Sequence, residues 1–273
     1  MRILATDLDR TLLPNGSWQA DPQAIPLFNR LVEETDVCLV YVTGRNLELT
    51  EQAISEYGIR YPDVLCSDVG TTIRHRVGDS WRRDHGWEQA LQSKSPRWDA
   101  AGVAGALSVV PGLERQAAQH QSAFKQSYHL AHDGREALLN AIRQRLAACF
   151  DETVIYSFDS ASGLGLLDIL PRSATKRTAL EYLAGQAGIA LEDVVFCGDS
   201  GNDLDALTAH FSGVLVRNAD AQLREGVRRE LEHNPGLRAY FARGDFHGLN
   251  GNYTSGVIEG CVHYGLFGDL PAT

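Results

Sequence analysis

The sequence predicts an α/β protein: a Rossmann-like, doubly wound parallel-sheet core with a smaller α/β domain inserted into it. Two patterns predict the core. Short apolar runs alternate with amphipathic segments, as in a parallel sheet with crossover helices, and several of these runs end at acidic, hydroxyl or glycine residues. The insertion is predicted because residues 81–163 break this rhythm and contain three of the four tryptophans.

The composition is that of a soluble globular chain. Its 273 residues are 44% hydrophobic and include 25 Lys+Arg and 35 Asp+Glu, a formal net charge of −10. Because no basic run interrupts this acidic balance, we expect no binding to nucleic acid or to a membrane surface. No apolar stretch approaches the roughly 20 residues of a membrane span, and the N-terminus lacks an apolar leader, so we expect a cytoplasmic protein.

The first part of the core is predicted to contain three strands, over residues 2–6, 37–42 and 64–67. They lead into Asp7-Leu8-Asp9, Thr43-Gly44-Arg45 and Asp68-Val69-Gly70. Two helices are predicted between them. Asp21-Pro22 has the pattern of an N-cap followed by proline at the first helical position, and a second helix over 46–57 stops at Gly58.

The inserted domain is predicted over residues 81–163, which leaves 1–80 and 164–273 for the core. Inside it, residues 124–130 and 153–158 alternate as strands, and 135–150 have helical periodicity. At least two of its three tryptophans are expected to pack in its own interior. The core then resumes with an apolar run over 165–170.

The last part of the core is predicted to contain a strand over 194–197 and helices over 221–232 and 255–264. The strand leads into Gly198-Asp199. Ligands of open α/β sheets bind beyond the carboxyl ends of the strands, so we expect the four strand exits to meet in one crevice. The glycine-rich segment 244–256 is either a loop near that crevice or a surface connection.

Acidic residues follow two of the predicted strands, in Asp7-Leu8-Asp9 and in the motif Gly198-Asp199-Ser200-Gly201-Asn202-Asp203. Carboxylates that lie this close repel each other unless a proton or a cation lies between them. Oxygen ligands of this kind suit Mg²⁺. A softer metal is excluded because cysteine and histidine are not grouped, and the pair His129-x-x-His132 lacks a third ligand.

Groups suited to a phosphate lie between the two acidic motifs. Thr43-Gly44-Arg45 opens a helix whose N–H groups can hold an anion, and Lys176 is one of only three lysines among 25 basic residues. A hydroxyl, backbone amides, an ammonium and a divalent cation together bind and stabilise a transferring phosphoryl group. A carboxylate can act as the nucleophile while a second one serves as general acid and base.

In order and spacing these motifs resemble the haloacid dehalogenase (HAD) superfamily of phosphatases. The insertion between the Thr43 and Lys176 motifs is similar to the large α/β cap of its type IIB members. Within that type the chain is most similar to sucrose-phosphate phosphatases. The motifs with counterparts there are Val42-Thr43-Gly44-Arg45, Ser67-Asp68-Val69-Gly70-Thr71, Phe124-Lys125-Gln126-Ser127-Tyr128, Asp168-Ile169-Leu170-Pro171, Lys176 and 198–203.

The resemblance implies a role for each matching residue. Asp7 is the expected nucleophile and a Mg²⁺ ligand, and Asp9 is the acid and base that also offers its backbone carbonyl to the metal. Asp199 is expected to bind the metal, and Asp203 to bind it or to support the site. The residues expected to hold the phosphate are Thr43, Gly44, Lys176 and Asn202. In the cap, Lys125 and Tyr128 are expected to contact the sugar.

One residue departs from the family pattern. Position 10 is Arg10, where the superfamily usually has glycine or asparagine. Arg10 is expected either to reach toward an anion of the substrate or to point outward.

The expected function is hydrolysis of a sugar phosphate by a Mg²⁺-dependent phosphatase of carbohydrate metabolism, sucrose 6-phosphate above all, through an aspartyl-phosphate. Alternatives are phosphatases of mannosylfructose, mannosylglycerate or glucosylglycerol phosphate, and phosphomannomutase, which has the same cap type. A non-catalytic sugar-phosphate sensor is a further alternative, although it predicts a damaged nucleophile or acid. As a partner, the resemblance suggests a glycosyltransferase or synthase of the same pathway.

Overall fold

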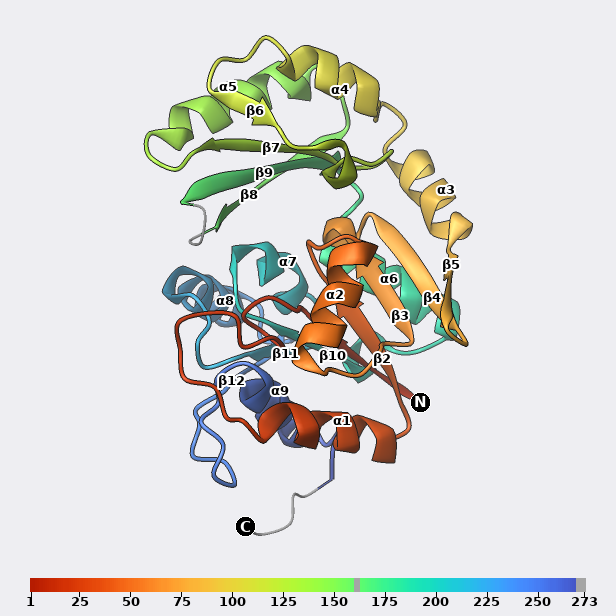
Figure 1. The fold of residues 1–273 in the computed structure, drawn as a ribbon, viewed down its shortest axis with the longest axis vertical. Coiled ribbons are helices and arrows are strands. Elements are labelled where there is room, and N and C mark those ends of the chain that lie inside the picture. The colour runs from red at the N-terminus through yellow and green to blue at the C-terminus, as the bar shows by residue number, and fades with distance from the viewer. Residues whose placement is uncertain (160–162, 269–273) are drawn as a thin grey trace. The chain divides into compact units, whose positions relative to one another are not determined.

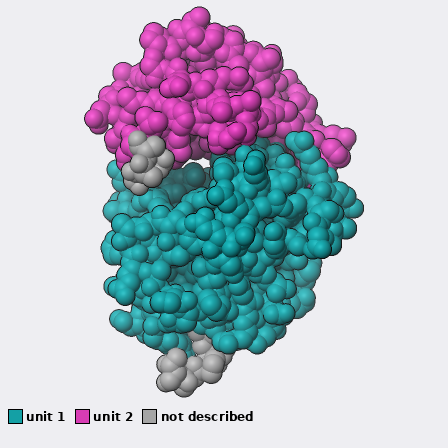
Figure 2. All heavy atoms as spheres, in the orientation of Figure 1, with its two compact units in different colours: residues 1–83, 176–273 teal, residues 84–175 magenta. Residues whose placement is uncertain are grey.

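The chain divides into two units, each with its own sheet (Figure 2). The computed structural model describes residues 1–159 and 163–268. We call Met1–Arg83 together with Lys176–Thr273 the core unit, and Asp84–Thr175 the cap unit. The core unit has an eight-stranded sheet that is mostly parallel and the cap unit a four-stranded antiparallel one, which confirms the predicted fold class.

The core sheet has the strand order β12-β11-β10-β1-β2-β3-β4-β5 (Figure 1). From β12 to β3 the neighbours are parallel, and β4 and β5 add an antiparallel edge. The bounds are β1 (Arg2–Thr6), β2 (Val37–Val42), β3 (Val64–Ser67), β4 (Thr72–Val77), β5 (Ser80–Arg83), β10 (Val194–Gly198), β11 (Ser212–Leu215) and β12 (Arg238–Phe241).

The chain reverses its direction of travel through the sheet between β1 and β10. From β1 it builds outward to β2 and β3, and after the cap unit it returns beside β1 and builds outward the other way to β11 and β12. Thr6 pairs with Cys197, and the Asp7 N–H donates to the Cys197 carbonyl at 2.9 Å. Asp7 and Asp199 therefore leave the sheet side by side at its topological switch point, where open α/β sheets bind ligands.

Helices cover both faces of the core sheet. The core unit contains α1 (Ala24–Glu34), α2 (Leu47–Tyr57), α6 (Lys176–Ala187), α7 (Leu204–Leu207), α8 (Ala221–His233) and α9 (Thr254–His263), with short 3₁₀ turns η1 (Asp68–Gly70), η3 (Leu191–Asp193) and η4 (Gly201–Asp203). Gly213 of β11 lies against Leu207 of α7, whereas its neighbour Val214 lies against α9. Successive strand residues point to opposite faces, so α7 and α9 pack on opposite sides.

The start of α1 differs from the prediction. Its N-cap is Gln23, which makes no side-chain capping bond. The Asp21 carboxylate instead accepts hydrogen bonds from the Asn250 N–H at 2.7 Å and the Ser255 hydroxyl at 2.6 Å. Asp21 therefore anchors the segment before α9 instead of capping its own helix.

The α2 helix has the predicted ends. Asn46 accepts a capping bond from the Leu49 N–H at 2.9 Å, and Gly58 ends the helix in the left-handed conformation with φ 65°. Glycine adopts this conformation without steric cost.

The cap unit is built on the strand order β6-β7-β9-β8. Its elements are α3 (His85–Lys94), α4 (Ala100–Leu107), β6 (Leu113–Arg115), η2 (Ala118–His120), β7 (Gln126–Ala131), α5 (Arg135–Ala147), β8 (Glu152–Asp159) and β9 (Leu164–Pro171). The run over 165–170 was expected in the core, but it belongs to β9, which pairs with β7 and β8. This pairing extends the cap unit to Thr175, beyond the expected boundary at 163.

A hydrophobic cluster fills the space between the cap sheet and its helices α4 and α5. It includes Trp98, Val103, Tyr128, Ile142 and Leu167, each at most 6% exposed. The Trp98 indole donates to the Ala123 carbonyl at 2.8 Å. Trp98 therefore packs in this interior as expected, whereas Trp87 of α3 is buried outside this cluster.

Within residues 1–159 and 163–268, no helix is both long enough and apolar enough to cross a membrane.

Two helix glycines provide a matched test of the packing of α9. A Cβ at Gly260 would collide with the Val214 side chain, whereas a Cβ at Gly185 of α6 would meet nothing within 4 Å. We expect Gly260→Ala to lower the free energy of unfolding by about 1–3 kcal/mol through overpacking. Gly185→Ala should raise it by about 0.4–1 kcal/mol. Urea denaturation of both variants checks this, and equal effects would contradict the close approach of α9 to β11.

Candidate active site

Four buried side chains meet at the switch point between β1 and β10. The Lys176 Nζ lies 3.0 Å from Asp7 Oδ1 and 2.7 Å from Asp203 Oδ1. Asp7, Asp199 and Asp203 each place one carboxylate oxygen within 4.8 Å of the others. We call these three carboxylates the acid cluster. The structure thus brings together residues from three distant motifs of the sequence.

Hydrogen bonds to the backbone hold Asp203 and the turn after β10 in place. Asp203 lies in the turn η4, and its Oδ2 accepts from the N–H groups of Asp199 at 3.0 Å and Ser200 at 3.1 Å. A Cβ at Gly198 would lie 2.7 Å from the Asp203 Cβ, so glycine is needed for this tight turn. With Oδ1 paired to Lys176, both oxygens of Asp203 hold neighbouring groups in place.

The electrostatics of the acid cluster favour a bound cation. Burial raises the pKa of Asp7 to about 7, assisted by the Asp203 and Asp9 charges and opposed by Lys176. Burial and the charges of Asp203 and Asp7 likewise raise the pKa of Asp199 to about 8. Burial alone lowers the pKa of Lys176, but the Asp203 and Asp7 charges outweigh it and raise that pKa. One ammonium offsets only part of this negative charge.

The donor set of the acid cluster fits a hard divalent cation such as Mg²⁺, which prefers carboxylate oxygens and retains several waters. Asp199 is held for this role: its Oδ1 accepts from the Thr11 hydroxyl at 3.0 Å. The cluster consists of oxygen ligands alone, which excludes a preference for soft metals at this place.

The Asp9 carboxylate lies outside the acid cluster. Arg45 donates to it from Nε to Oδ2 at 2.9 Å and from Nη2 to Oδ1 at 2.7 Å, and the Asn15 amide donates to Oδ1 at 2.6 Å. Burial raises the pKa of Asp9, but the hydrogen bonds and charge of Arg45 outweigh it and lower that pKa below its ordinary value. Arg45 therefore keeps Asp9 ionised.

The residues expected to hold phosphate lie at the carboxyl ends of the strands or beside Lys176. Thr43, buried, follows β2 and accepts from the Arg45 N–H at 3.1 Å, and Gly44 beside it is exposed. The Asn202 Oδ1 accepts from the Ser200 hydroxyl at 3.0 Å and from Lys176 at 3.4 Å. The Lys176 ammonium therefore contacts Asn202 as well as the carboxylates of Asp7 and Asp203.

The two cap residues have different surroundings. Lys125 is only 4% exposed and immediately precedes β7. Tyr128 is 2% exposed and belongs to the hydrophobic cluster under the cap helices. Its contact with the sugar stays a prediction.

Arg10 does not simply point outward, and its contact with a substrate anion stays a prediction. Its φ of 59° is in the left-handed region, which accounts for the usual glycine or asparagine at this position. Its Nη2 lies 2.9 Å from Asp199 Oδ2 and 3.3 Å from Asp220 Oδ2. The guanidinium therefore turns back onto the acid cluster.

Sequence reasoning assigned no role to four residues that hold the site together: Thr11, Asn15, Arg45 and Asp220. Arg45 lies inside the Thr43-Gly44-Arg45 motif and Thr11 follows Asp9 by two residues, so their position was the available signal. Asn15 and Asp220 lie outside the motifs, and Asp220 is 210 residues from its partner Arg10. Only tertiary structure reveals that contact.

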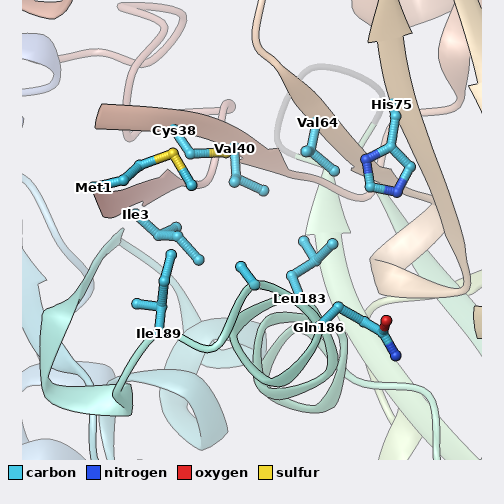
Figure 3. Close-up of a pocket in the computed structure, with 10 residues that line it drawn as sticks. Met1, Ile3, Cys38, Val40, Val64, His75, Leu183, Gln186 and Ile189 are labelled. Atoms are coloured by element: carbon cyan, nitrogen blue, oxygen red, sulfur yellow. The ribbon is translucent and has the colours of Figure 1, made fainter. Parts of the chain in front are cut away.

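An apolar cavity of about 270 Å³ lies at the opposite end of the core sheet (Figure 3). It is lined by Ile3, Cys38 and Val64, near the starts of β1, β2 and β3, and by Leu183 of α6. Because Asp7 follows the end of β1, this cavity is separate from the acid cluster and lacks its polar groups.

Comparison with known proteins places the chain in a family. The family described as sucrose-6F-phosphate phosphohydrolase matches residues 1–265. A protein of Nitrosococcus oceani described as a HAD-like hydrolase is 38% identical over 267 residues, 96% of this chain and 71% of the relative. The mannosylfructose-phosphate phosphatase of Agrobacterium fabrum is 30% identical over 268 residues, 97% of this chain and 98% of the relative. The chain spans 54–60% of the length of the plant sucrose-phosphatases that it matches.

A solved structure shares the fold. The sucrose-phosphatase of Synechocystis sp. PCC6803, in complex with sucrose and phosphate, has a TM-score of 0.75 at 24% identity and covers 97% of this chain and 99% of its own. The sequence matches, the fold and the convergence of the motifs agree. The chain belongs to the sucrose-6F-phosphate phosphohydrolase family and is a HAD-like phosphohydrolase.

Proposed function

We propose that this protein is a Mg²⁺-dependent phosphatase that hydrolyses sucrose 6-phosphate to sucrose and phosphate. The observation that supports this most is the buried contact of Lys176 with Asp7 and Asp203, with Asp199 beside them, at the switch point of the sheet. The family description names the same substrate class.

In this proposal Asp7 and Asp199 supply carboxylate ligands to the metal, and the backbone carbonyl of Asp9 supplies another. Asp203 orients Lys176 and the turn after β10, because both of its oxygens already hold those groups. Bound Mg²⁺ would neutralise phosphate oxygens and favour the ionised form of the neighbouring carboxylates. Lys176, Asn202, Thr43 and Gly44 would bind the phosphate oxygens.

The reaction has two steps. First, an Asp7 oxygen attacks phosphorus, the bond from phosphorus to the sugar oxygen breaks, and Asp9 gives its proton to that oxygen. An aspartyl-phosphate and free sugar result. In the second step Asp9 takes a proton from water as the water oxygen attacks phosphorus, which releases phosphate and restores the Asp7 carboxylate.

Arg45 controls the proton on Asp9 in this scheme. The ionised Asp9 that Arg45 stabilises is the form needed to accept a proton from water. For the first step Asp9 must be protonated, and a neutral carboxyl is held less strongly by a guanidinium. Arg45 therefore binds the ionised carboxylate of Asp9 more strongly than the protonated carboxyl.

A second candidate substrate is mannosylfructose phosphate. It is favoured by the relative from Agrobacterium fabrum, whose length this chain matches almost completely, whereas the plant sucrose-phosphatases are longer. Lys125 remains the cap residue proposed to contact the sugar. Association with a synthase of the same pathway also stays a prediction.

The Asp7 nucleophile can be tested by a single substitution. We expect Asp7→Asn to lower phosphate release from sucrose 6-phosphate by at least about 10³-fold, because the amide cannot attack phosphorus. Circular dichroism should show a folded protein. Asp36→Asn is the matched control, since the Asp36 side chain is 89% exposed and remote from the acid cluster in sequence and sheet position. Near-normal activity of Asp7→Asn would rule out the mechanism.

The substrate can be tested by phosphate release from a panel of mono- and disaccharide phosphates with Mg²⁺. We expect kcat/KM to be highest for sucrose 6-phosphate, by about 100-fold over monosaccharide phosphates, which corresponds to about 2.7 kcal/mol of transition-state binding. A higher value for mannosylfructose phosphate would select the second candidate. Phosphate transfer that requires a sugar bisphosphate, without net release, would indicate a mutase.

A further inference from the structure

Arg10 places a fixed positive charge beside the proposed metal site. Most of the charge near the acid cluster comes from residues that match the family motifs, but Arg10 occupies a position where the family usually has an uncharged residue. Its Nη2 lies 2.9 Å from Asp199 Oδ2. The Asp199 side chain is 1% exposed and that of Arg10 is 44% exposed, so the carboxylate of the pair is shielded from water while the guanidinium is partly solvated.

The backbone of Arg10 is fastened on both sides. Its N–H donates to the Asn15 Oδ1 at 2.7 Å, and its carbonyl accepts from the Asn218 amide at 2.7 Å. Asn218 in turn accepts from the Tyr253 N–H at 2.7 Å. These bonds hold the residue at φ 59° and aim its side chain at Asp199.

The Thr11 hydroxyl donates to Oδ1 of Asp199, whereas Oδ2 accepts no hydrogen bond from the described residues and has only an ion-pair contact with Arg10, at 2.9 Å. A divalent cation that uses Asp199 must share this carboxylate with the guanidinium and meets its repulsion. Arg10 also donates to the Asp220 carboxylate, from Nη2 at 3.3 Å and from Nη1 at 3.5 Å, and these bonds hold the guanidinium beside Asp199. The Asp220 N–H also donates to the Asp199 carbonyl at 2.8 Å, which keeps the two acids adjacent.

We propose that Arg10 is an internal counter-ion of Asp199 that competes with Mg²⁺ and lowers the affinity of the acid cluster for the metal. This inference rests on the metal site of the proposed function. The guanidinium stabilises the metal-free site, so a higher concentration of Mg²⁺ is needed to load the acid cluster.

Calorimetric titration of Mg²⁺ into chelator-stripped protein, without substrate, tests the inference. Arg10→Asn removes the charge and suits the left-handed backbone, because asparagine adopts this conformation readily. We expect it to bind Mg²⁺ at least tenfold more tightly than the wild type. The control Arg10→Lys keeps the charge and should bind within about threefold of the wild type. The rise in melting temperature on adding Mg²⁺ should also be larger for Arg10→Asn.

The outcomes separate this inference from the proposed function. If the wild type and Arg10→Asn bind Mg²⁺ with equal affinity, or if Arg10→Lys shows the same tightening, the counter-ion role is wrong and the metal site stands. If neither the wild type nor Arg10→Asn binds Mg²⁺, the metal assignment of the proposed function fails, and the role of Arg10 fails with it.

Discussion

The Lys176 ammonium between the Asp7 and Asp203 carboxylates is the interaction on which the rest of the site depends. Buried carboxylates in contact are strongly unfavourable unless cations offset them. Lys176 begins α6, Asp7 ends β1, and Asp203 lies in the turn after β10, so the ion pairs also join three parts of the core unit that are far apart in sequence. The same contacts that compensate charge set the geometry of the site.

Arginine completes this compensation at the two acids that Lys176 does not reach. Arg45 holds Asp9 as a carboxylate, and Arg10 contacts Asp199. Each of the four acids therefore lies beside a positively charged side chain. Lys176 contacts Asp7 and Asp203, Arg45 contacts Asp9, and Arg10 contacts Asp199. In the proposed mechanism a metal and a phosphate would enter an arrangement that is already partly neutralised, so their binding would exchange ion pairs as well as form new contacts.

Much of this could be predicted from the sequence, and the errors have definite causes. The strands that lead into Asp7 and Asp199 were correct, because a buried parallel strand followed by an acid is a local pattern. The strand over 165–170 was assigned to the wrong unit, since an apolar strand does not show which sheet it joins; its partners β7 and β8 decide that. Asp21 was expected to cap α1, but Asn250 and Ser255 compete for it from over 200 residues away.

By itself the sequence determined the fold class and the motifs whose acids and lysine meet at one end of the core sheet, because each depends on short-range periodicity or on ordered residues. The roles of those residues in phosphoryl transfer belong to the proposal. Tertiary structure alone decided the rest. It put Tyr128 in a hydrophobic interior, gave Asp9 to Arg45, and turned Arg10 onto Asp199 and Asp220. Side-chain partners across the fold are set by packing and by charge compensation over long sequence separations, which local patterns do not encode.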